Sequence, residues 1–222
     1  EKPDGHYGFH YYAPVNMEEY KGKTLLIEGS IPKAFMDAIS LSDTVPENLQ
    51  SRPLLHFAPR TGWMNDPNGF SLYRGEYHLF YQYHPYSSVW GPMHWGHQKT
   101  RDFIKWEQLP CALAPDTEYD GQGCFSGSAV EHEGKHILMY TGVLDRVEAD
   151  GSHPIRQTQC IAVGDGVNYE KLPANPVITA DALPEGSSGE DFRDPRIWKE
   201  GNTFYAAVGS LGADGSGQIA LF

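Results

Sequence analysis

The residues of this chain with the clearest capacity for chemistry are two aspartates, each of which precedes a proline. Asp66 lies in the run WMNDPNG at residues 63–69, and Asp194 lies in the run RDP at residues 193–195. The Pro-Asn-Gly run after Asp66 predicts a turn, which would hold the carboxylate at the end of a strand. Carboxylates beside aromatic rings are the groups that act on sugars. The two aspartates therefore indicate sugar chemistry.

Composition limits the class of protein that these residues serve. The chain has 222 residues, a net charge of −12, 13% aromatic residues, 24 Gly and 16 Pro. So much Gly and Pro favours many turns and short strands over long helices, which predicts an all-β fold. The acidic charge argues against nucleic acids and anionic membranes as partners, because both are bound by basic residues. We expect a small-molecule sugar as the partner.

The cysteines bear on the compartment. Cys111, Cys124 and Cys160 are an odd number with wide spacing, which is neither a disulfide framework nor a zinc pattern. We therefore expect buried thiols in a reducing compartment, and hence a cytoplasmic protein. The sequence shows no signal peptide and no apolar run long enough to span a bilayer. Because the chain begins at Glu1 rather than Met, secretion stays open as the alternative.

The sequence also contains an internal repeat of about 60 to 68 residues. Apolar strands that follow a turn glycine begin after Gly75, Gly134 and Gly201. A second pattern, aromatic-Glu-x-Leu-Pro, recurs at residues 106–110 and 169–173. Each unit has room for about four antiparallel strands, which is the size of a β-propeller blade.

The repeat brings distant residues together. In a propeller the first strand of each blade lines the central axis, so the starts of these strands converge at one end of the channel. Asp66, Ser126 and Asp194 occupy equivalent positions, each shortly before one of the glycine-led strands. The repeat therefore predicts that these three residues surround one pocket.

Residues 1–52 do not fit the repeat, and we interpret them as an N-terminal extension that precedes the propeller part at 53–222. Residues 24–28, TLLIE, predict a strand because they are mostly apolar and β-branched or aliphatic. Residues 32–39 predict a short helix with Phe35, Met36 and Ile39 on one face.

Other chemistries are less consistent with the pattern. The pair His94-x-x-His97 suggests a metal, but on a strand that spacing splays the two rings, and no carboxylate lies at a ligand-like interval. We expect neither a metal nor another cofactor, and interpret these histidines as structural or sugar-contacting. Ser126 lacks the Gly-x-Ser-x-Gly pattern of a serine nucleophile, so hydrogen bonding is its expected role. The run GSSG at 186–189 has no following Lys and helix, so it predicts a loop rather than a phosphate cradle.

The runs WMNDPNG at 63–69, FSGS at 125–128 and RDP at 193–195 together resemble the motifs of glycoside hydrolase family 32. That family comprises invertases, fructan hydrolases and sucrose-6-phosphate hydrolases. The resemblance begins near Leu54 and continues to the end of the chain. It implies a five-bladed β-propeller followed by a β-sandwich, of which this chain would cover about two and a half blades.

The resemblance also implies a role for each matching residue. Asp66 would be the nucleophile that attacks the anomeric carbon of a fructosyl unit, giving a fructosyl-enzyme intermediate and overall retention. Asp194 would stabilise the oxocarbenium-like transition state. Residues that bind or enclose the sugar would be Trp63, Asn65, Gln82, Trp90, Phe125, Ser126 and Arg193.

One part of that machinery has no match. The family's general acid is a Glu in a Glu-Cys pair that follows the RDP motif, and this sequence contains no Glu-Cys pair. We therefore expect the chain to be a fragment that does not hydrolyse its substrate alone. The implied activity is release of fructose from sucrose, sucrose 6-phosphate or short β-fructans. A fructosyltransferase and a non-catalytic fructan-binding propeller stay open as alternatives, and the oligomeric state is not fixed.

Overall fold

The computed structural model describes residues 13–44, 53, 56–144, 147, 149–152 and 154–222. The chain divides into two compact units, Glu1–Thr61 and Gly62–Phe222. The first unit contains a 3-10 helix, η1 (Glu18–Tyr20), and one α-helix, α1 (Lys33–Ala38). The predicted helix at 32–39 is thus confirmed, and it is one residue shorter at each end.

The strand predicted at residues 24–28 is wrong. These residues have no strand hydrogen bonding, and Leu26 is 81% exposed. A strand needs a neighbour that takes up its backbone N–H and C=O groups. Among the residues that the structure describes in the first unit, none forms a strand that could be that neighbour. An apolar run without a pairing partner therefore stays irregular.

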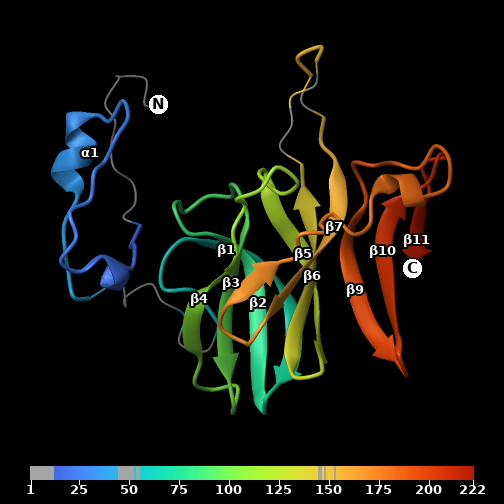
Figure 1. Cartoon of the computed structure of the whole chain (residues 1–222), viewed down its shortest axis with the longest axis horizontal. Helices are drawn as coiled ribbons and strands as arrows, with labels where there is room; N and C mark the ends of the chain where they lie inside the picture. Colours follow the sequence, from blue (N-terminus) through green and yellow to red (C-terminus); the bar gives the residue numbers. More distant parts are fainter. Residues whose placement is uncertain (1–12, 45–52, 54–55, 145–146, 148, 153) are drawn as a thin grey trace. The chain divides into compact units, whose positions relative to one another are not determined.

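The second unit consists of three antiparallel sheets that follow one another along the chain (Figure 1). The first sheet contains β1 (Trp63–Tyr73), β2 (Glu76–His84), β3 (His94–Thr100) and β4 (Glu107–Leu113). The second contains β5 (Gly123–His132), β6 (Lys135–Val143), β7 (Gln157–Gly164) and β8 (Tyr169–Lys171). The third contains β9 (Arg193–Glu200), β10 (Thr203–Leu211) and β11 (Gly217–Leu221), preceded by a 3-10 helix, η2 (Ala180–Ala182). The strands keep chain order within each sheet, which confirms the all-β fold. The first two sheets have the four strands that the repeat predicts, and the third has three.

The turn glycines explain why the first two sheets begin with the same hairpin. Arg74 and Gly75 have φ values of 49° and 79°, and Glu133 and Gly134 have φ values of 50° and 74°. Positive φ at both central residues gives the tight turn whose twist matches that of paired strands. Two residues thus connect β1 to β2, and two connect β5 to β6.

The turn into the fourth strand is also repeated in atomic detail. The Asp102 Oδ1 accepts the backbone N–H groups of Ile104 and Lys105 at 2.9 and 2.8 Å. One repeat later, the Asp165 Oδ1 accepts those of Val167 and Asn168, both at 2.9 Å. These backbone hydrogen bonds stabilise the charged form and lower the pKa of both carboxyls. The sequence repeat is therefore a repeat of turn geometry.

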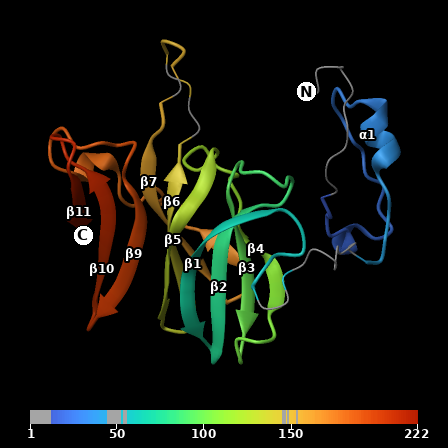
Figure 2. The same ribbon diagram turned by 180° about the vertical axis from the view of Figure 1, so that it is seen from behind.

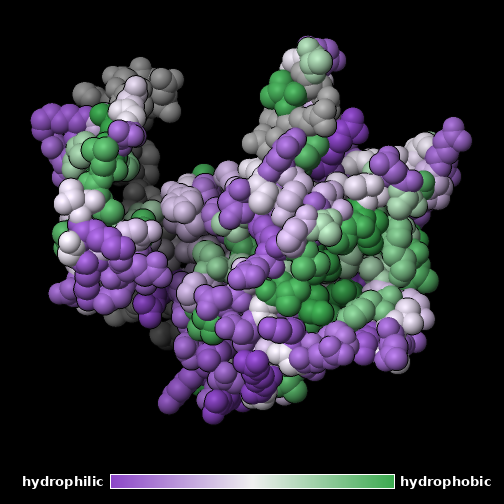
Figure 3. Space-filling model, in the orientation of Figure 1, coloured by the Kyte–Doolittle hydropathy of each residue, from purple (hydrophilic) through white to green (hydrophobic). Residues whose placement is uncertain are grey.

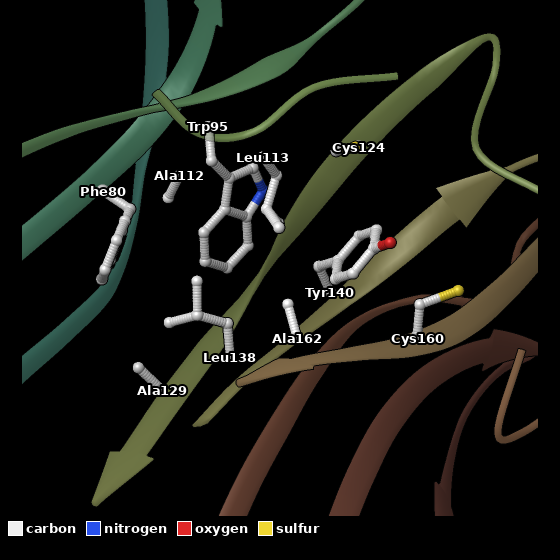
Figure 4. Close-up of a cluster of buried hydrophobic side chains, with 10 residues drawn as sticks. All are labelled: Phe80, Trp95, Ala112, Leu113, Cys124, Ala129, Leu138, Tyr140, Cys160 and Ala162. Carbon is white, nitrogen blue, oxygen red and sulfur yellow. The ribbon is translucent and has the colours of Figure 1, made fainter. Parts of the chain in front are cut away.

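The main core lies between the first two sheets (Figure 4). Phe80, Trp95, Leu138 and Tyr140 are fully buried there. The Trp95 indole N–H donates to the carbonyl of Phe125 at 3.0 Å, so the polar end of this large side chain is satisfied across the two sheets. This packing fixes the first sheet against the second, and with it the relative positions of their first strands.

The expectation of buried thiols holds for Cys124 and Cys160, whereas Cys111 is exposed, and all three are free. Burial raises the pKa of the Cys160 thiol to about 12. Cys111 differs because β4 is the edge strand of its sheet.

A smaller apolar cluster lies where the second and third sheets meet. Met139, Ile197 and Ala206 are its buried members. Hydrophobic side chains gather in this region of the surface in Figure 3, and Figure 2 shows the same three sheets from behind. In the part of the chain that the structure describes, no helix is both long and apolar enough to cross a membrane.

Candidate active site

The first strands of the three sheets are neighbours in space. β1 contacts β5, and β5 contacts β9. β1 and β5 also run in the same direction: the Asn68 side chain near the start of β1 meets Ser126 near the start of β5, and the Tyr73 hydroxyl at the end of β1 meets the turn carbonyl of Gly134. The start of β9 lies at the same end, because the Asp194 N–H donates to Thr141, which pairs with Phe125 near the start of β5. The beginnings of the three strands therefore lie at one end of the unit, as the repeat predicts.

The turn predicted after Asp66 is wrong, because β1 continues through Pro67 and Asn68, which pair with β2. Each of the three motifs lies instead at a β-bulge. Asn65 and Asp66 fall between the paired residues Met64 and Pro67. Ser126 is the extra residue between Phe125 and Gly127, and Asp194 falls between the paired residues Arg193 and Arg196. A bulge interrupts the ladder and redirects side chains that would otherwise alternate between the faces of the sheet. The bulges thus present both carboxylates from the innermost strands.

Asp66 is exposed, and its carboxylate is linked to the next sheet. The Ser126 hydroxyl donates to the Asp66 Oδ2 at 3.4 Å. The amide of Asn68, which is only 7% exposed, donates to the same hydroxyl oxygen at 3.4 Å. Because the amide occupies a lone pair of the Ser126 oxygen, the hydroxyl proton is directed to Asp66. Asn68 is a residue of the motif for which the sequence predicted no role.

Asp194 has an unusual backbone and an altered acidity. Its φ is 60°, in the left-handed region that few residues other than glycine adopt. Its backbone N–H donates to the Thr141 Oγ1 at 3.1 Å. Desolvation by the surrounding protein raises the pKa of the Asp194 carboxyl, the Arg193 charge lowers it, and the negative charge of Asp66 raises it again. The influence of Asp66 shows that the two carboxylates share one electrostatic environment.

Two of the predicted sugar-binding residues are tryptophans, and their side chains have different surroundings. The Trp63 indole N–H donates to the Asn65 Oδ1 at 2.7 Å, so the ring fixes the amide beside Asp66. Trp90 is 56% exposed and packs edge-on against Phe125, with ring centroids 6.2 Å apart. An exposed ring of this kind can form the wall of a sugar site.

Gln82 and Arg193 are engaged with other protein groups. Gln82 is buried opposite the Asn65–Asp66 bulge, and its amide donates to the Cys124 carbonyl at 2.9 Å. Arg193 makes its ion pair with Asp191 at 3.1 Å. The sequence places Arg193 beside Asp194, and the structure shows that the guanidinium is held by the preceding loop.

The histidine pair of β3 is divided between two environments. The His94 Nδ1 lies 3.1 Å from the Pro92 carbonyl, whereas the His97 Nε2 lies 2.8 Å from the His78 Nδ1. Among the described residues, no group of three His, Cys, Asp or Glu side chains is arranged to hold a metal ion.

Thr141 and Gln159 are buried residues that the motifs do not reveal, although one signal could have found Thr141. It is the seventh residue after its turn glycine, Gly134, as Gln82 is the seventh after Gly75. Both side chains reach the first strand of the next sheet. The position of Gln82 in its repeat therefore identifies Thr141 as the equivalent residue in the next repeat.

Comparison with known proteins agrees with this arrangement. Residues 56–222 match the model of the Glycosyl hydrolases family 32 N-terminal domain. The sucrose-6-phosphate hydrolase of Zymomonas mobilis is 47% identical over 175 residues, which are 77% of this chain and 33% of that protein. The raffinose invertase of Escherichia coli is 41% identical over 191 residues, which are 83% of this chain and 39% of that protein.

Solved structures show the same relationship. The Bombyx mori GH32 beta-fructofuranosidase is 45% identical with a TM-score of 0.68, over 79% of this chain and 35% of that chain. The sucrose-6-phosphate hydrolase of Lactobacillus gasseri is 38% identical with a TM-score of 0.68, over 78% of this chain and 34% of that chain. The chain thus spans about a third of the length of the relatives that it matches. Its sheets are blades of the five-bladed propeller, and the chain belongs to glycosyl hydrolase family 32.

Proposed function

We propose that this chain supplies the nucleophile and the transition-state stabiliser of a retaining β-fructofuranosidase. The observation that carries the proposal is the placement of Asp66 and Asp194. They lie at bulges near the starts of first strands, and the charge of one alters the acidity of the other. Two carboxylates that face one site are what retaining hydrolysis of a glycoside requires, together with a general acid.

In the proposed reaction the Asp66 carboxylate attacks the anomeric carbon of the fructosyl unit. The bond to the leaving oxygen breaks, a general acid protonates that oxygen, and a fructosyl ester of Asp66 forms. Water then gives a proton to the deprotonated general acid and attacks the anomeric carbon, which breaks its bond to the Asp66 oxygen, releases fructose and restores Asp66. The Ser126 hydroxyl at 3.4 Å orients the Asp66 carboxylate. The Asp194 carboxylate stabilises the positive charge that develops on the sugar ring.

The general acid is proposed to be a glutamate outside these 222 residues, because the sequence contains no Glu-Cys pair. Glu190 precedes the RDP motif but lies on a loop, and only its backbone contacts Arg193. On this proposal the 222 residues alone do not hydrolyse the substrate.

The proposed substrate class is the β-fructofuranosides, with sucrose or sucrose 6-phosphate as the main candidates. The names of the relatives support this choice: they include sucrose-6-phosphate hydrolases and a raffinose invertase. A variant of the Bombyx mori enzyme has been solved in complex with sucrose, which supports a small-molecule sugar as the partner. The levanase of Bacillus subtilis, 44% identical over 154 residues, supports short fructans as a further substrate.

The test is Asp66→Asn in the full-length protein. The substitution keeps the shape of the side chain but removes the nucleophilic charge, so fructose release from sucrose is expected to fall by at least ~10³-fold. Circular dichroism and the unfolding midpoint are expected to match the wild type. Asp181→Asn serves as the matched control. Asp181 lies on η2, outside the three motifs, so this variant should keep full activity.

Mass spectrometry of the quenched wild-type reaction separates this mechanism from direct displacement by water. A peptide containing Asp66 that carries one hexosyl unit is the expected result. Near-normal turnover of Asp66→Asn, or a hexosyl unit on another residue, would refute the assignment of the nucleophile.

A further inference from the structure

Asp194 is held by a buried chain of hydrogen bonds that comes from the second sheet. Its backbone N–H donates to the Thr141 Oγ1 at 3.1 Å. The Thr141 hydroxyl donates in turn to the Gln159 Oε1 at 2.9 Å, and the Gln159 amide donates to the Phe192 carbonyl at 2.7 Å. This series of hydrogen bonds therefore begins at the Asp194 backbone and ends at the backbone of Phe192, two residues earlier.

Burial makes this chain rigid. Thr141, Gln159 and Phe192 are each 0% exposed. Thr141 and Gln159 are paired residues on β6 and β7, so the backbone ladder sets the distance between their side chains. Thr141 uses its proton for Gln159 and a lone pair for Asp194, while Gln159 uses its oxygen and its nitrogen once each. Since all three residues are fully buried, an alternative orientation of either polar side chain would leave a buried polar group unpaired, at a cost of about 1–3 kcal/mol.

The backbone of Asp194 needs such support. A non-glycine residue with φ of 60° is strained, by roughly 1 kcal/mol, and would relax toward the β region if it were free. The two anchors, the Asp194 N–H and the Phe192 carbonyl, lie on either side of Arg193. They fix the peptide groups before and after that residue, and hence the direction in which the Asp194 carboxylate leaves the bulge.

The repeat contains the same device in the preceding sheet. Gln82 and Thr141 are equivalent, and the Gln82 amide donates to the Cys124 carbonyl, just before Phe125 and Ser126. In each case a polar side chain on the second strand of one sheet holds the start of the first strand of the next. The third sheet has Val208 at this position, which carries no polar group.

We propose that Thr141 and Gln159 are positioning residues for Asp194, which hold its left-handed backbone and thereby direct its carboxylate toward the site. The structural part of this inference stands on the hydrogen bonds alone. Its consequence for turnover rests on the proposed function.

The experiment compares three variants of the full-length protein. Thr141→Val removes the hydroxyl and nearly keeps the shape, and Thr141→Ser restores the hydroxyl without the methyl group. Thr158→Val is the matched control, because Thr158 lies next to Gln159 and its hydroxyl contacts only the Cys160 sulfur at 3.9 Å. Two readouts are used: hydrogen exchange of the segment around Asp194, and kcat and KM for sucrose.

The expected results follow from the geometry. In Thr141→Val the Asp194 amide loses its acceptor, so its exchange should accelerate by at least ~10-fold while exchange in the β5–β6 ladder stays unchanged. The kcat should fall by about 10- to 100-fold with little change in KM, since a misplaced carboxylate weakens an interaction that forms mainly in the transition state. Thr141→Ser should recover both readouts to within about threefold, and Thr158→Val should match the wild type.

Gln159→Met is a second test of the same inference. Met has a similar length but lacks both the oxygen that accepts from Thr141 and the nitrogen that donates to Phe192. It should accelerate the same exchange and lower kcat in the same direction. Wild-type exchange and kcat in both Thr141→Val and Gln159→Met would overturn the inference. If the wild-type protein itself releases no fructose, the proposed function fails, and the exchange readout still decides whether Thr141 and Gln159 hold Asp194.

Discussion

At the scale of single residues, Asp194 is the place where the proposed function and stability conflict. Its carboxylate lies near the like charge of Asp66 and is partly desolvated, and both effects disfavour the charged form and raise its pKa. Its backbone is left-handed, a conformation that Asn and Asp tolerate better than other residues with side chains. The protein therefore keeps a charge there that the fold itself does not favour.

Asp194→Asn is consequently expected to inactivate and stabilise at once. A raised pKa means that the charged form is less favourable in the folded state than in the unfolded chain, and Asn carries no such charge, so the unfolding midpoint at neutral pH should rise slightly. The gain should vanish below the ordinary pKa of Asp, where the wild-type carboxyl is protonated in both states. Thermal unfolding of the variant and the wild type at pH 7 and pH 3 measures the gain and its disappearance in acid. A lower midpoint at pH 7 would show that the Asp194 charge supports the fold.

At the scale of the elements, glycines mark two kinds of position that the sequence does not distinguish. Gly75 has φ of 79° at a hairpin turn, and a Cβ there would meet nothing within 4 Å. Gly127 follows the Ser126 bulge, and a Cβ there would lie 2.0 Å from the Met139 carbonyl oxygen. The first glycine is needed for its backbone angle, and the second for the close approach of β5 to β6.

The two substitutions to alanine should therefore differ in cost. Gly75→Ala pays only for a left-handed backbone, about 1–2 kcal/mol of unfolding free energy. Gly127→Ala forces β5 away from β6 beside the site, so it should cost more than ~3 kcal/mol. Urea unfolding followed by tryptophan fluorescence gives both values. Equal losses in the two variants would contradict the division into turn and packing glycines.

At the scale of the whole second unit, the first two sheets meet through a buried histidine network as well as through apolar packing. His78 and His97 are in contact at 2.8 Å, and the His136 ring lies between Ser71 at 2.9 Å and the Tyr169 hydroxyl at 2.7 Å. Burial lowers the pKa of His97 to about 2 and that of His136 to about 3. Burial also lowers the pKa of His78, while the charge of Glu76 raises it and that of Lys99 lowers it. The network is thus built for neutral imidazoles.

The protein should therefore lose stability in mild acid. Because the folded-state pKa values are lowered, the unfolded chain binds more protons than the folded chain below about pH 6.5, and stability present above that pH is lost as the pH falls toward about 3. His97→Gln removes one such group and should flatten the fall by about 1 kcal/mol per pH unit between pH 6 and pH 4. His132→Gln, at the end of β5 and outside the histidine network, is the matched control. Urea midpoints across this range provide the measurement, and an unaltered slope in His97→Gln would place the acid sensitivity elsewhere.

Much of this protein could be predicted from the sequence because much of it is local. The hairpins need Gly75, Gly134 and Gly201, and a turn residue acts within a few positions of itself. The repeat of these turns predicted the blades, which the sheets confirm. From the blades it followed that Asp66, Ser126 and Asp194 should lie at one end of the unit. The family motifs coincide with bulges because a bulge also needs particular residues in one short segment.

The tertiary structure decided what depends on residues far apart in the chain. Residues 24–28 are apolar enough for a strand, but a strand also needs a partner, and the described part of the first unit offers none. The partner of Arg193 is Asp191, although Asp194 is the nearer residue in sequence. The link from Thr141 to Asp194 joins the second sheet to the third, so only the packing of the sheets creates it. The sequence by itself determined which residues are candidates for the site, because their motifs are local, and the packing of one blade against the next determined how their backbones and side chains are held.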